Sequence, residues 1–228
     1  KNFDLYESEY EEVEPGILNI RIKGTRVFAV RPQDGINAAT GMIDFLFQID
    51  FLKNEIGNFC VFYLTKFGYS HDGSNIDCDF RDQISTPLTL SPDLFDLENN
   101  AITFSVHCRF PVTIDFETVI SKIKSGIVEE NVFISSERVS PAHYIPPDSK
   151  LVSSLMAVYR DFTGDSAAKP VTMEGGTYAR MLKNAVAFGP LFPGEPQVAH
   201  SPNEYLNLDS IIKATKIYAR SIYKLACD

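Results

Sequence analysis

Residues 174–180, with the sequence EGGTYAR, have types and spacing that could bind an anion. Paired glycines let backbone N–H groups approach a ligand closely, and a helix that starts just after them favours negative charge. A plain structural turn is the alternative interpretation, because a single Gly-Gly pair is also ordinary turn chemistry. The residues alone leave both interpretations open.

A second candidate is His200, which lies in a proline-rich stretch close to Asn203 and Glu204. Histidine is the most common metal ligand in proteins, and a neighbouring carboxylate can orient its other ring nitrogen. The chain has no HxxxH or HxD pattern that would complete a metal site. His200 is therefore either a single metal ligand or an ordinary histidine.

Six segments are similar in amino-acid sequence and in order to motifs of one enzyme family. They are KGTRVFAVRPQDGINAATGM (23–42), HCRFP (107–111), AHYIPP (142–147), EGGTYAR (174–180), VAFGPLFPG (186–194) and AHSPNEY (199–205). Together they resemble the PepV-type dinuclear zinc dipeptidases, within the wider group that includes carnosinases and aminoacylases. The resemblance runs over nearly the whole chain.

The resemblance implies that His200 binds one of two zinc ions, and that the Glu204 carboxylate orients the His200 ring. It also implies that Arg109 binds the carboxylate of a dipeptide, because a forked guanidinium matches a carboxylate. The glycine turn then contacts the same end of the substrate through the backbone groups of Gly175, Gly176 and Thr177. Arg180 braces this turn in our interpretation and does not touch the substrate.

The activity that the resemblance implies is dipeptide hydrolysis by metal-activated water, with a glutamate as general base. The other metal ligands and that glutamate belong to HxDxVP and EExG segments that precede the lid in such enzymes. Nothing similar occurs in these 228 residues, which start at Lys1. We therefore expect a truncated chain that begins inside the lid, has no catalytic residue of its own and is inactive alone.

The lid motif of the family reads G-x-x-A-H-x-x-x-P, and here GTRVFAVRP puts Phe28 at the histidine. A phenyl ring cannot donate a hydrogen bond to the scissile carbonyl. Losing one such donor costs roughly 100- to 1000-fold in rate. Either His71 or Arg31 compensates, or the parent protein hydrolyses peptides poorly, or it is a degenerate member that binds peptides without cutting them. A third interpretation is an autonomous interaction module.

Periodicity predicts an α+β fold for residues 1–140: an antiparallel-sheet lid domain with helices on one face, incomplete at its amino terminus. The expected strands and helices are a hairpin of 17–24 with 27–30, helices at 35–53 and 58–67, strands at 86–91, 94–98, 101–109 and 131–139, and a helix at 115–127.

Three prolines in residues 141–147 mark a domain boundary. Beyond it, residues 141–228 are expected to form the carboxyl-terminal α/β segment of a zinc-exopeptidase catalytic domain. The predicted helices and strands there are helices at 149–162 and 208–225 and short strands at 170–173 and 185–188.

Composition excludes some partners. A net charge of −9 argues against nucleic acid, which needs clustered Lys and Arg. No apolar run approaches the roughly 20 residues of a membrane span. The four cysteines form no CxxC pair, which indicates free thiols in a reduced cytoplasm. The resemblance implies a dipeptide as substrate and a monomer.

Overall fold

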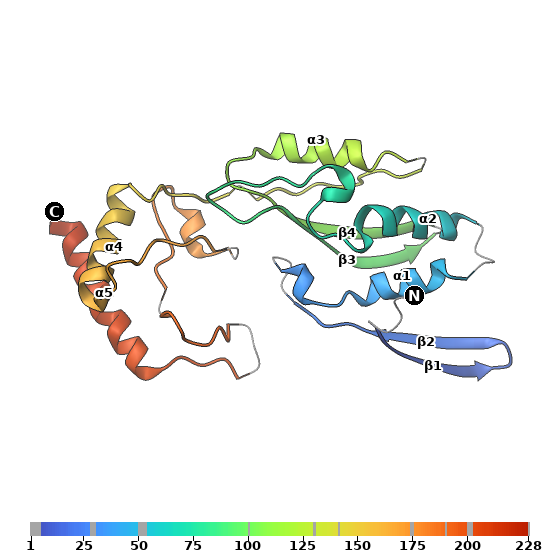
Figure 1. Ribbon diagram of the computed structural model, residues 1–228, viewed down its shortest axis with the longest axis horizontal. Helices are drawn as coiled ribbons and strands as arrows, with labels where there is room; N and C mark the ends of the chain where they lie inside the picture. Colours follow the sequence, from blue (N-terminus) through green and yellow to red (C-terminus); the bar gives the residue numbers. More distant parts are fainter. Residues whose placement is uncertain are drawn as a thin grey trace. The chain divides into compact units, whose positions relative to one another are not determined.

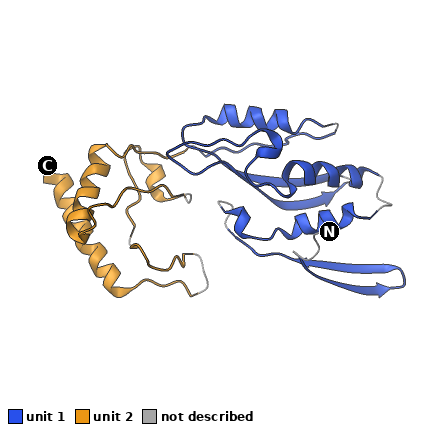
Figure 2. Cartoon of the chain, in the orientation of Figure 1, with its two compact units in different colours: residues 1–141 blue, residues 142–228 orange. Residues whose placement is uncertain are grey.

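The computed structural model describes residues 6–27, 31–49, 54–99, 101–129, 131–140, 142–173, 176–189, 191–199 and 203–227. It divides the chain into two compact units, Lys1–Pro141 and Ala142–Asp228, which Figure 2 colours blue and orange. The assignment of a lid and a catalytic segment to these parts of the chain stays a prediction.

Among its described residues, the first unit combines two antiparallel hairpins with three α-helices (Figure 1). This confirms the α+β class with antiparallel sheets. The strands are β1 (Glu7–Glu14), β2 (Ile17–Lys23), β3 (Thr89–Glu98) and β4 (Ala101–Arg109). The helices are α1 (Ala38–Phe47), α2 (Glu55–Tyr63) and α3 (Phe116–Gly126), with short helical turns η2 (Pro32–Asp34), η3 (Leu64–Gly68) and η4 (Ser74–Ile76).

The first hairpin pairs β2 with the glutamate-rich β1, whereas the sequence predicted residues 27–30 as the second strand, of which residues 28–30 lie outside the described residues. The two strands are joined by a turn in which Gly16 has φ +80°, a conformation that glycine adopts without strain. Lys23 Nζ lies 2.6 Å from Glu7 Oε1 and 3.0 Å from Glu9 Oε1. This cation offsets repulsion within the acidic strand, which is why a charged segment can pair here.

The second hairpin carries one long strand where two were predicted. Residues 86–91 and 94–98 were expected as separate strands, but β3 runs through both with an irregular register between Asp93 and Asp96. Leu94 has φ +50° in this irregular stretch. The predicted strand at 101–109 is confirmed as β4, and its residues alternate between exposed and half-buried.

The core of this unit lies between the β3–β4 hairpin and the helices. Tyr63 is 0% exposed, and its hydroxyl lies 2.7 Å from Thr40 Oγ1. Burial raises the pKa of Tyr63 to about 12, so the phenol is neutral at physiological pH. Its ring packs among those of Phe59, Phe67, Phe95 and Phe104, with centroids 5.4 to 6.4 Å away.

Side-chain caps set the helix boundaries. The helix predicted at 35–53 is shorter, because Asn37 Oδ1 accepts hydrogen bonds from the N–H groups of Ala39 and Thr40 and starts α1 there. The helix predicted at 58–67 is confirmed as α2, which starts earlier and continues into the π-helical turn η3. The helix predicted at 115–127 is confirmed as α3, capped by Asp115.

The strand predicted at 131–139 was wrong. Residues 131–140 have no strand structure, and the side chain of Phe133 is 80% exposed. The stretch is fastened differently: Glu137 Oε1 accepts from Lys124 Nζ of α3 at 2.6 Å. The alternation of apolar residues predicted a strand here, but the segment pairs with no neighbouring strand among the described residues.

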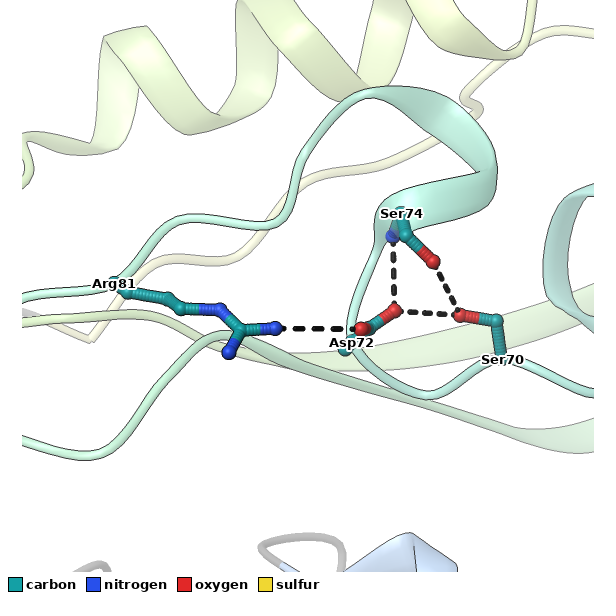
Figure 3. Close-up of polar contacts among 4 residues, drawn as sticks. All are labelled: Ser70, Asp72, Ser74 and Arg81. Carbon is teal, nitrogen blue, oxygen red and sulfur yellow. Dashed lines mark hydrogen bonds and ion pairs between the residues drawn. The ribbon is translucent and has the colours of Figure 1, made fainter.

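A polar turn precedes the second hairpin (Figure 3). Asp72 Oδ1 accepts hydrogen bonds from Ser70 Oγ at 2.7 Å and from the Ser74 N–H at 3.0 Å, and Arg81 Nη2 lies 3.6 Å from Asp72 Oδ2. Hydrogen bonds from Ser74 and Ser70 lower the pKa of Asp72 to about 2. The turn is therefore stabilised by an ionised carboxylate.

We expect Asp72 to make the first unit acid-sensitive. Because its folded pKa of about 2 lies below the ordinary value of 3.8, its contribution is present above pH 4 and is lost as pH falls towards 2. The side chain is 47% exposed, so solvent screening limits the effect to about 1 kcal/mol or less. In thermal melting of the 228-residue chain between pH 2 and 5, the melting temperature should fall less with decreasing pH for Asp72→Asn than for the wild type. Asp96→Asn on β3 is the control, and an equal change in both variants would contradict this role.

The second unit contains the helices α4 (Lys150–Thr163) and α5 (Leu208–Cys227) and the 3-10 turn η5 (Tyr178–Met181). Both long helices were predicted. Ser149 caps the start of α4, and Gly164 ends it with φ +74°. The two helices pack together through six buried residues: Val152, Leu155, Val158, Ala214, Ile217 and Ser221.

The strands predicted at 170–173 and 185–188 are absent from the described residues of the second unit. Backbone carbonyls that a strand would pair are bound by side chains instead. His143 Nε2 lies 2.6 Å from the Ala185 carbonyl, and Tyr218 Oη donates to the Phe188 carbonyl at 2.8 Å. These bonds hold residues 185 and 188 in place although neither lies in a strand.

Candidate functional site

Arg109 is the last residue of β4 and lies on the exposed face of the β3–β4 hairpin. Thr89 is its partner across the strands, and the next pair, Leu90 and Cys108, points into the core. Within the described residues, the Arg109 guanidinium forms no hydrogen bond or ion pair. Its five N–H donors are therefore available to an anionic ligand.

The same face carries a second polar group next to Arg109. His107 Nε2 lies 3.0 Å from Asp93 Oδ2, with the two side chains 55% and 39% exposed. Asp93 comes from β3 and is a diagonal neighbour of His107 across the hairpin. The other carboxylate oxygen, Asp93 Oδ1, is buried and has no hydrogen-bond partner among the described residues.

In the second unit, the structure brings Gly176, Thr177 and Arg180 together. A Cβ atom at Gly176 would lie 3.1 Å from Arg180 Nη1, so the guanidinium rests against the glycine backbone. The Arg180 N–H donates to the Thr177 carbonyl at 3.2 Å, and η5 starts at Tyr178, directly after Thr177. Gly175 lies outside the described residues.

The segment that leads towards His200 is attached to α5. Glu195 Oε2 accepts from the Phe192 N–H at 2.7 Å, and Glu195 Oε1 accepts from the Ser210 hydroxyl of α5. The hydrogen bond from the Phe192 N–H is the main cause that lowers the pKa of Glu195. Lys213 Nζ lies 4.4 Å from the centre of the Phe192 ring, a cation–π contact. His200 itself lies outside the described residues, whereas Glu204 is described and exposed.

Residues 10–224 match the family described as Peptidase family M20/M25/M40. The chain belongs to this family. It is 35% identical over 215 residues to "Putative dipeptidase YtjP" of Bacillus subtilis (strain 168), an alignment that covers 94% of this chain and 45% of the relative. It is 30% identical over 234 residues to "Putative dipeptidase SSP1012" of Staphylococcus saprophyticus, covering 100% and 50%. The chain thus spans about half the length of these relatives.

Within this M20 chain, the described residues do not make up a metal site by themselves. No three His, Cys, Asp or Glu side chains among them gather as a metal would require. In addition, no helix of the described ranges is both long enough and apolar enough to cross a membrane. Phe28, at the lid-histidine position of the resemblance, lies outside the described residues.

Alternation along β4 puts His107 on the same strand face as Arg109, but no role was predicted for His107. Its pairing with Asp93 depends on the register between β3 and β4, which the irregular stretch after Asp93 obscures in the sequence. Of the two residues considered as replacements for the lid histidine, Arg31 is exposed. His71 has a buried Nδ1 with no hydrogen-bond partner among the described residues.

Proposed function

We propose that the protein containing this chain is a zinc-dependent dipeptidase of the PepV type, acting on unblocked dipeptides. The observation that carries the proposal is that the Arg109 guanidinium is exposed and forms no hydrogen bond or ion pair within the described residues. The resemblance assigns this residue to the substrate carboxylate. The names of the relatives from Bacillus subtilis and Staphylococcus saprophyticus, each beginning "Putative dipeptidase", support it.

In this proposal Arg109 holds the carboxylate of the dipeptide through two parallel N–H···O bonds. The backbone groups of Gly175, Gly176 and Thr177 contact the same end of the substrate. The position of Arg180 against Gly176 supports a bracing role for this side chain, since its charge lies over the turn.

The proposed metal site draws one ligand, His200, from this chain, with Glu204 orienting it. Two bound zinc ions would supply a water activated for attack on the peptide carbonyl. The remaining ligands and the general base are proposed to come from other parts of the parent protein. Residues 1–140 would then act as the lid and residues 141–228 as the end of the catalytic domain, in a cytoplasmic monomer.

The test is hydrolysis of a panel of free dipeptides by the whole parent protein. We expect turnover that a chelator lowers at least about 100-fold, because the metal-activated water supplies the nucleophile, and that added zinc restores. Turnover that survives complete metal removal would contradict a metallodipeptidase.

The alternative function is peptide binding without cleavage, which the phenyl ring of Phe28 at the lid-histidine position favours. No turnover by a protein with two bound zinc ions that still binds dipeptides would support this alternative. The same panel therefore separates the two proposals.

A further inference from the structure

We propose that His107 is a second substrate-contacting residue, which selects dipeptides with an acidic carboxyl-terminal residue. This inference rests on the proposed function, in which Arg109 binds the terminal carboxylate. The observation behind it is that His107 and Arg109 stand side by side on one exposed strand face, with His107 held by Asp93.

The spacing along β4 suits two neighbouring carboxylates. His107 and Arg109 are two residues apart on the same face, so their Cα atoms lie about 7 Å from each other. An aspartate or glutamate at the end of a dipeptide carries its main-chain carboxylate and its side-chain carboxylate a few ångströms apart. One can bind the Arg109 guanidinium while the other reaches the His107 ring.

Asp93 fixes which edge of the His107 ring a ligand can meet. A carboxylate only accepts hydrogen bonds, so His107 Nε2 donates to Asp93 Oδ2. This leaves Nδ1 as the edge for a ligand, and among the described residues no partner occupies it. In the imidazolium form Nδ1 carries a hydrogen and can donate to a carboxylate.

The experiment compares the whole parent protein with His107→Gln on matched dipeptides that end in Glu, Asp, Gln or Leu. We expect His107→Gln to lower kcat/KM about tenfold, or about 1.4 kcal/mol, for the two acidic substrates and less than about twofold for the others. Asp93→Asn should also lower kcat/KM for the acidic substrates, but by less, since it weakens the hydrogen bond that orients the His107 ring and leaves the ring in place. Thr103→Ala, on the same exposed face of β4, is the control.

Equal losses for acidic and neutral substrates, or no loss at all, would overturn the role of His107. Binding calorimetry with the same dipeptides gives the same comparison without requiring turnover. If the wild-type protein neither cuts nor binds any dipeptide, the proposed function fails together with this inference. Suppose instead that the wild-type protein binds or cuts dipeptides and that Arg109→Ala lowers kcat/KM or affinity for all of them. If His107→Gln then lowers neither quantity selectively for the acidic dipeptides, only the inference fails.

Discussion

Replacing Arg109 by alanine in the whole parent protein is expected to lower kcat/KM for free dipeptides by at least about 100-fold, mainly by raising KM. Two charge-assisted hydrogen bonds to the substrate carboxylate are removed, each worth about 1.5 to 3 kcal/mol. The strand itself should be undisturbed, because the side chain is exposed and forms no hydrogen bond or ion pair within the described residues. Steady-state kinetics on the dipeptide panel measures the change.

Arg109→Lys should recover only part of the loss, since lysine keeps the charge but not the planar fork. Arg138→Ala, in the irregular stretch 131–140, is the matched control and should change kcat/KM less than twofold, because exposed residues away from a site have small effects. Unchanged kinetics for Arg109→Ala would remove this residue from the site and, with it, the main support for the proposed function.

The largest effect on stability is expected at Tyr63. Tyr63→Ala should lower the free energy of unfolding of the first unit by about 3 to 5 kcal/mol, because it leaves a large cavity among four phenylalanine rings. Tyr63→Phe keeps the ring and loses only the hydrogen bond to Thr40, which costs about 1 kcal/mol. Urea unfolding of the 228-residue chain measures both changes.

Tyr10→Ala provides the comparison, since Tyr10 is 80% exposed on β1 and should matter by about 0.5 kcal/mol or less. If Tyr63→Ala cost no more than Tyr10→Ala, the aromatic cluster would not be the centre of the core. A loss for Tyr63→Phe as large as that for Tyr63→Ala would assign the stability to the hydroxyl and not to the ring.

Local signals in the sequence predicted the long helices well. Asp115 before α3, and Ser149 and Gly164 around α4, satisfy the ends of those helices, and such caps are visible without a structure. Strand pairing was predicted poorly because it depends on distant residues. The charged β1 has low strand propensity, and its pairing is visible only once Lys23 lies opposite Glu7.

The candidate site divides in a similar way. Arg109 could be singled out by resemblance, and the structure shows that it lies on the exposed face of β4. The contact between Asp93 and His107 could not be predicted, because the irregular register after Asp93 looks like a break between two strands. The assignments of Phe28, Gly175 and His200 fall outside the described residues and stay predictions.

The attachment of residues 185–195 to α5 has a consequence for how the protein is made. The Ser210 hydroxyl donates to Glu195, Lys213 lies over the Phe192 ring, and Tyr218 donates to the Phe188 carbonyl. All three α5 residues come later in the chain than the segment that they hold. A ribosome therefore completes this segment before any of its α5 anchors exist. Because domains fold as units while synthesis proceeds at about 5 to 20 residues per second, the segment must wait for α5 to emerge. The family segment VAFGPLFPG can reach its final shape only after translation has passed Tyr218.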